Sequence, residues 1–160
     1  MNTLTMVMSG ETDLVVTRRF NAAPEAVYRA HLDVDMLKTW MLGPEGWTTP
    51  SCELDPREGG AFAYTWEDSS SGERFTIRGH FVKLDPPHRI EHVETMEMPG
   101  MTSPESAVVT EFRGDGPGTL MTMTIRYDSA ESRQGAVESG MEEGMAWSYD
   151  NLDRLVGADA

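Results

Sequence analysis

The sequence contains one cysteine, Cys52, among its 160 residues. A single cysteine excludes an internal disulfide and a cysteine-rich metal site. It lies in TTPSCEL, a predicted strand segment, where a lone cysteine usually behaves as a small apolar residue. Long apolar runs are missing too: no stretch reaches the ~18 residues that a membrane-spanning helix needs, and the N-terminus lacks signal-peptide features. We therefore expect a cytoplasmic protein without membrane insertion.

Positive charge is also scarce, with 13 lysines and arginines against 27 acidic residues and a formal net charge of -14. A nucleic-acid-binding surface needs clustered lysine and arginine, so this class of partner is excluded. No Cys-x-x-Cys pair occurs, and no serine lies in a Gly-x-Ser-x-Gly elbow. We therefore predict no metal site and no cofactor, and a serine hydrolase lacks support.

The length and the absence of repeats or linkers predict one domain over residues 1–160, with a core from 13 to 156. DLVVTRRF alternates as a strand, and NAAPEAVYRAHLD predicts a helix with Pro24 in its first turn. Asp33 is predicted to cap a second short helix, VDMLKTWML, which Gly43-Pro44 would end.

Alternation broken by turn residues dominates from Thr48 to Tyr127. The connections are short and rich in Gly, Pro, Asp and Ser, which favours antiparallel hairpins. The longest loop, 98–105, is a candidate mobile flap. Apolar spacing over 131–156 predicts one long C-terminal helix. The predicted strands of this region are 48–55, 60–67, 73–84, 88–97, 106–113 and 118–127.

The predicted fold class is therefore α+β, with two short helices after the first strand. A curved sheet of seven antiparallel strands must bury its apolar face against the long C-terminal helix. A strongly bent sheet around one helix need not close completely. We expect a pocket between the two.

Five segments of the chain carry a resemblance to a known family: TRRFNAAPEAVYRAHLD, LKTWMLGPEGW, ELDPREGGAFAY, IRGHFVKLDPPHRIEHV and EGMAWSYDNLDRL. Through them the chain resembles the START-like superfamily (SRPBCC, Bet v 1-like) from about Asp13 to Leu155. It is most similar to the branch related to activators of the heat-shock-protein-90 ATPase. The resemblance implies the helix-grip fold. The superfamily includes hydrophobic-ligand carriers, cyclases, hydrolases and co-chaperone domains, so the fold alone does not settle the activity.

Three aromatic residues, Phe62, Tyr64 and Trp66, share one face of the predicted strand 60–67. The resemblance implies that the face toward the long helix lines the cavity, although aromatic stripes are also ordinary core. The facing helix carries Gly140 and Gly144, each of which weakens a helix by roughly 1 kcal/mol. Either close packing of the helix on the sheet or room for a ligand would offset that cost.

The strand HRIEHVETME places His92 and Glu94 on the same face as Ile90 and Met96. If this face looks inward, both polar side chains project into the pocket. The pair could act as a weak candidate for general acid–base catalysis, or it could orient a polar ligand group. The alternatives are that both face solvent, or that they form a self-satisfied polar pair.

Further residues complete the predicted ligand-binding set. Met123 and Tyr127 lie on one face of the last strand, and a thioether adapts to irregular apolar shapes. Trp147, on the long helix, is a candidate for the cavity mouth. The full predicted set is Phe62, Tyr64, Trp66, His92, Glu94, Met123, Tyr127, Gly144 and Trp147.

These patterns favour a cytoplasmic START-like domain that binds a hydrophobic or amphipathic small molecule between the sheet and the C-terminal helix. A second hypothesis is an enzyme of the cyclase or hydrolase type that uses His92 or Glu94. A third is a module that binds a chaperone through its outer surface in a stress response, as the family resemblance implies. A homodimer is possible because the sheet has two edges.

Overall fold

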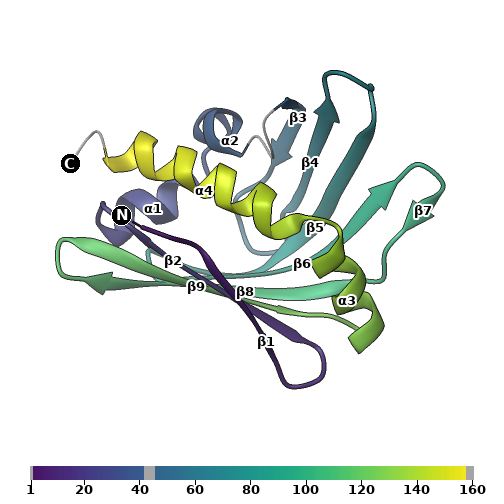
Figure 1. Ribbon diagram of the computed structural model, residues 1–160. Coiled ribbons are helices and arrows are strands. Elements are labelled where there is room, and N and C mark those ends of the chain that lie inside the picture. The colour runs from purple at the N-terminus through teal and green to yellow at the C-terminus, as the bar shows by residue number, and fades with distance from the viewer. Residues whose placement is uncertain (1, 42–45, 158–160) are drawn as a thin grey trace.

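A computed structural model describes residues 2–41 and 46–157 of the chain. The polypeptide forms one strongly curved sheet with helices on its concave side (Figure 1). Its elements follow in chain order: β1 (Thr5–Ser9), β2 (Asp13–Phe20), α1 (Pro24–Ala30), α2 (Val34–Trp40), β3 (Trp47–Leu54), β4 (Ala61–Asp68), β5 (Arg74–Asp85), β6 (Arg89–Met98), β7 (Met101–Thr102), β8 (Ser106–Asp115), β9 (Gly118–Arg126), α3 (Ala130–Glu138) and α4 (Met141–Gly157).

The sheet has nine antiparallel strands in the order β1-β2-β9-β8-β6-β5-β4-β3, and β7 pairs with β6 alone. It bends around α4, which crosses the concave side as a single long rod (Figure 1). Apolar residues alternate along β2 and β4, so one face of each strand packs inward while the other meets solvent. The predicted α+β class and helix-grip architecture are confirmed.

Two strands were not predicted from the sequence. β1 is exposed along most of its length, so it shows no alternation of buried and exposed residues, although it pairs with β2 through all five positions. β7 falls within 98–105, which we expected to be a loop. Met98 and Met101 pair across the two-residue turn Pro99-Gly100, and Gly100 has a φ of +77°. Proline followed by glycine at positive φ is typical of a type II turn.

The two short helices begin where the sequence predicted. Pro24 is the first residue of α1, where its missing N–H breaks no helical hydrogen bond. The Asp33 carboxylate accepts a hydrogen bond from the backbone N–H of Met36, at 3.2 Å, and so caps α2 as expected. The predicted stop at Gly43-Pro44 lies outside the described residues, and α2 ends at Trp40.

The predicted single helix over 131–156 is wrong in one respect, because it consists of two helices. α3 ends at Glu138, α4 begins at Met141, and Gly140 between them has a φ of +86°. Glycine adopts this left-handed conformation without a steric penalty, and it commonly ends a helix. Gly140 therefore redirects the chain and makes no room for a ligand. The α3 helix buries no residue completely, but its Val137 packs against Leu14, Val108 and Ile125 of the sheet.

The C-terminal half of α4 packs tightly against α1, α2 and β2. Trp40 stacks on Tyr149 with ring centroids 5.6 Å apart, and its indole N–H donates to the carbonyl of Ala30 at 2.9 Å. We call this region the closed end. Its large side chains are 0–3% exposed: Arg18, Phe20, Leu37, Trp40, Phe112, Met121 and Leu152.

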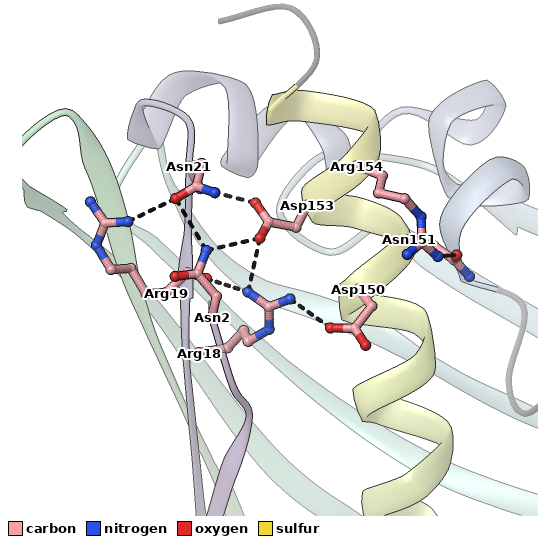
Figure 2. Close-up of polar contacts among 8 residues, drawn as sticks. All are labelled: Asn2, Arg18, Arg19, Asn21, Asp150, Asn151, Asp153 and Arg154. Atoms are coloured by element: carbon pink, nitrogen blue, oxygen red, sulfur yellow. Dashed lines mark hydrogen bonds and ion pairs between the residues drawn. The ribbon is translucent and has the colours of Figure 1, made fainter.

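A buried arginine fastens α4 to the sheet at the closed end (Figure 2). The Arg18 side chain, 2% exposed, projects from β2 and donates to the carboxylates of Asp150 at 2.8 Å and Asp153 at 3.2 Å. Asp153 also accepts hydrogen bonds from the Asn21 backbone and the Asn2 side chain. Burial alone would raise the pKa of Asp153, but these hydrogen bonds and Arg18 hold it below its usual value.

No helix within the described parts of the chain is long and apolar enough to cross a membrane.

Candidate functional site

The concave face is less completely covered under the N-terminal half of α4. His92 and Glu94 lie on the inward face of β6, in line with the buried Ile90, yet their side chains are 15% and 26% exposed. An inward-facing side chain with accessible surface must border space that water can enter. We call this region the open end. Its half-buried members are Ile77, His92, Glu94, Met96, Met123, Tyr127, Gly144 and Met145.

A hydrogen bond joins the two polar residues of the open end. The Nε2 atom of His92 lies 2.7 Å from Oε1 of Glu94, so the imidazole N–H donates to the carboxylate. The rings of His92 and Phe62 meet edge to face, with ring centroids 5.2 Å apart and planes at 88°. The structure therefore brings together the His–Glu pair that strand alternation suggested, on the same side of the sheet as α4.

The neighbouring strands leave the Glu94 side chain without bulky cover. Glu94 pairs with Gly79 on β5 and with Ser106 on β8. A Cβ atom at Gly79 would lie 1.8 Å from the carbonyl oxygen of Val93, so the close approach of the strands requires glycine there. The two positions beside the carboxylate thus carry no side chain and a small one.

Three tyrosines with little exposed surface come from three different parts of the fold: Tyr64 on β4, Tyr127 just after β9 and Tyr149 on α4. Burial is the main cause that raises the pKa of each phenol, and the negative charge of Glu94 raises all three further. The pKa of Tyr127 rises to about 12. The three phenols are therefore neutral at pH 7.

The three predicted aromatic residues of β4 form one wall of the interior. Phe62, Tyr64 and Trp66 are 4%, 9% and 7% exposed. Phe62 stacks on Tyr64 at 5.1 Å, and Trp66 stacks on Phe75 at 4.9 Å. The Trp66 indole N–H donates to the carbonyl of Met41 at 3.1 Å. These rings are packed on one another, and the accessible surface lies farther along the sheet, at β6 and β9.

The remaining predicted site residues are spread along β9 and α4. Met123 pairs with Val16 and Thr110 on the concave face. The Tyr127 hydroxyl donates to the sulfur of Met141 at 3.6 Å, which links the end of β9 to the start of α4. Trp147 is 39% exposed on α4, so much of its ring meets solvent.

His31 is a polar residue of the interior that we did not include among the predicted site residues. Its ring lies 5.1 Å from Trp40 and 5.0 Å from Phe112, and its Nδ1 hydrogen bonds to the carbonyl of Val27 at 2.8 Å. Burial lowers its pKa to about 4, opposed by the Val27 hydrogen bond and assisted by His92. Its Nε2 is buried and has no hydrogen-bond partner among the described residues. The sequence did contain a signal for a buried His31, because this residue follows the apolar Val27 by four positions, about one helical turn.

Within residues 2–41 and 46–157, no group of three histidine, cysteine or acidic side chains could hold a metal ion. His88 and His92 are four residues apart, but on an extended strand this spacing separates them by roughly 13 Å. The ring of His88 instead contacts the carbonyl of Phe112 at 3.1 Å.

Residues 21–157 match the sequence model of the family described as Activator of Hsp90 ATPase homolog 1-like protein. The chain belongs to this family. The match spans all elements from α1 to α4, and of the closed end it leaves out only Arg18 and Phe20 of β2. None of the curated proteins matches the sequence.

Solved structures of similar proteins share the fold of this family member. A protein from Rhodobacter sphaeroides is 26% identical, with a TM-score of 0.88, and the match covers 98% of this chain and 99% of that chain. A protein from Mycobacterium smegmatis is 24% identical, with a TM-score of 0.85 and 96% of both chains covered. A Nitrosomonas europaea protein is 24% identical, with a TM-score of 0.80, covering 95% of this chain and 98% of that one.

Proposed function

We propose that this protein binds a hydrophobic or amphipathic small molecule at the open end, between the sheet and the N-terminal half of α4. The observation that carries the proposal is the accessible surface on His92 and Glu94, which lie on the inward face of β6. Apolar surface of the ligand removed from water would supply affinity at ~25 cal/mol per Å², before the costs of ordering are subtracted. The His–Glu pair would orient the polar end of the ligand.

The predicted lining residues fit this proposal in different ways. Phe62, Tyr64 and Trp66 would form the apolar wall on one side, while Met123 and Tyr127 would lie on the other. Gly144 and Trp147 belong to α4, which covers the site. Met123, Met96 and Met145 give the open end flexible side chains that adapt to a ligand's shape.

A fluorescent apolar probe tests the proposal directly. N-phenyl-1-naphthylamine, which fluoresces strongly only in apolar surroundings, is titrated into the protein at pH 7. We expect a saturable increase with one site per chain. Gly144→Leu, which places a large side chain beside the proposed site, should abolish the increase. Because leucine is a better helix former than glycine by roughly 1 kcal/mol, this variant should fold with an unchanged or higher melting temperature.

Gly135→Leu provides the matched control. Gly135 lies in α3, and nothing is within 4 Å of a Cβ atom placed there. This variant should bind the probe as the wild type does. Absence of saturable binding to the wild-type protein would reject the proposal. Loss of stability in Gly144→Leu would instead show that the helix packs directly on the sheet at this point, and it would also count against a binding space.

Catalysis is the second candidate, and the 2.7 Å hydrogen bond between His92 and Glu94 favours it. A histidine next to a carboxylate is suited to proton transfer in a cyclase or hydrolase reaction. Under this hypothesis His92→Ala would abolish turnover of an activated aryl ester such as p-nitrophenyl acetate. The melting temperature would change little. A wild-type rate equal to that of buffer alone would exclude this ester, and loss of folding in His92→Ala would assign the residue to structure.

The family name supports a third candidate, binding to an Hsp90-type chaperone through the outer surface. Such binding would be measured by pull-down with the purified chaperone. Chaperone binding should be insensitive to Gly144→Leu, because Gly144 belongs to α4 on the concave side of the sheet, away from the convex face. Sensitivity to Gly144→Leu would tie any chaperone contact to the ligand site instead.

A further inference from the structure

Glu94 lies apart from the ion pairs that arginines form on the sheet. On the convex face, arginines of three strands are paired: Arg78 with Glu97, Arg89 with Glu91 and Glu111, and Arg126 with Asp13. Glu94 lies on the opposite face, and its one ion-pair partner among the described residues is His92. No lysine or arginine of the described chain therefore neutralises this carboxylate.

The buried arginine of the concave face does not reach Glu94 either. Both terminal nitrogens of Arg18 are held by Asp150 and Asp153 at the closed end. His31 also contributes no positive charge at pH 7, since burial lowers its pKa to about 4. Neither Arg18 nor His31 therefore places a positive charge beside Glu94, and the net charge of -14 adds a negative field around the protein.

Aromatic rings complete the surroundings of this carboxylate. Phe62 lies edge to face with its partner His92 and stacks on Tyr64. The negative charge of Glu94 also raises the pKa of Tyr64, Tyr127 and Tyr149, after the larger effect of their burial. The faces of aromatic rings attract cations, and this attraction is stronger where water is partly removed. A carboxylate whose histidine partner packs on aromatic rings, with glycine and serine as its cross-strand neighbours, is a suitable receptor for a positively charged nitrogen.

We infer that the ligand of the open end is an organic cation, with an apolar body and an ammonium or amidinium group that binds the Glu94 carboxylate. This inference rests on the proposed ligand-binding function and narrows it to a chemical class. His92 donates to Oε1 of Glu94, which leaves lone pairs of the carboxylate for the ligand's N–H groups. The apolar body would lie along the rings of β4 and the methionines of β6, β9 and α4.

Three probes with one ring system test the charge preference. They are 1-naphthylmethylamine, which is a cation at pH 7, neutral 1-naphthalenemethanol and the anion of 1-naphthoic acid. Dissociation constants are measured by calorimetry or by competition with N-phenyl-1-naphthylamine. We expect the amine to bind about tenfold more tightly than the alcohol, because a charge-assisted hydrogen bond is about twice as strong as a neutral one and each ~1.4 kcal/mol is tenfold. The acid should bind most weakly.

Glu94→Gln should remove this order, so that the amine and the alcohol bind within about twofold of each other. Glu91→Gln is the matched control, since Glu91 is on the same strand but on the convex face, where it pairs with Arg89. It should retain the wild-type order. A melting temperature for each variant confirms that it is folded before binding is compared.

The outcomes separate the two proposals. If none of the probes binds to the wild-type protein, both the ligand-binding function and its chemical class are rejected. If all three bind with similar affinity, or if the acid binds as tightly as the amine, the binding function stands and the inference of a cationic ligand is overturned. An order that survives Glu94→Gln would likewise overturn the assignment to Glu94.

Discussion

The closed end and the open end are built from the same sheet and the same helix, yet they differ in how α4 meets the sheet. Near Leu152 the helix packs on side chains that are at most 3% exposed, and Arg18 is held by Asp150 and Asp153. Two turns earlier, near Met145, the facing residues keep accessible surface. A helix fixed at one end can cover a site at its other end without filling it.

The largest difference between the ends should appear when their apolar side chains are shortened. Leu152→Ala removes a fully buried side chain and should lower the free energy of unfolding by about 4 kcal/mol, through lost burial and the cavity left behind. Met145→Ala, two turns earlier in the same helix, should lower the free energy of unfolding by only about 1 kcal/mol because its side chain is half-buried. Urea denaturation at pH 7 measures both. Equal costs would contradict the distinction between the ends.

A smaller effect is expected from the polar attachment of α4. Arg18→Ala should cost about 3 kcal/mol, because removal of one partner from a buried ion pair leaves the carboxylate of Asp153 uncompensated. Arg19→Ala is the control on the next residue, whose side chain is 33% exposed and pairs with Asp115. It should cost less than about 1 kcal/mol. If Arg18→Ala is as mild as Arg19→Ala in urea denaturation, the arginine does not fasten the helix.

The smallest of the three effects concerns pH and His31, whose ring packs against Trp40 and Phe112 of the closed end. Its pKa is lowered to about 4 in the folded protein, against a usual value of about 6.5. The unfolded chain therefore takes up the proton first, and stability falls as pH decreases from about 6.5 toward 4. Between pH 7 and pH 5 the loss should be about 2 kcal/mol.

His31→Gln, which cannot titrate, isolates this contribution. The difference in unfolding free energy between pH 7 and pH 5 should shrink by that amount relative to the wild type. Carboxylates with lowered pKa values, such as Asp13 and Asp153, lose their contribution only below their usual pKa of 3.8 and so do not act in this window. An identical pH dependence in both proteins would show that the His31 ring is open to water.

The course of the strands was predictable because it depends on local patterns. Alternation and turn residues placed the strand 48–55 within a residue of Trp47–Leu54, and 118–127 within a residue of Gly118–Arg126. The same alternation put His92 and Glu94 on one face. β1 was not predicted because an edge strand that is exposed along most of its length shows no alternation of apolar and polar residues.

The site was less predictable, since its members meet only after the sheet has curved. Gly140 was visible in the sequence, but a glycine in a helical pattern is equally consistent with a break, a close contact or an open space. The positive φ of Gly140 shows that the helix breaks there. The ring contact between Phe62 and His92 joins residues of β4 and β6, which are not neighbours in the sheet, and no periodicity encodes such a contact.

By itself the sequence determined the two short helices, the six strands between residues 48 and 127, the fold and the acidic character of the protein. These follow from the repeat of the side chains along strands and helices and from a count of charges. Only the tertiary structure decided that the two ends of α4 are covered unequally, and that Glu94 pairs with His92 on the concave face, away from the arginines of the sheet. The physical reason is that burial and electrostatic environment depend on distances between separate elements, which the curvature of the sheet and the placement of α4 fix together.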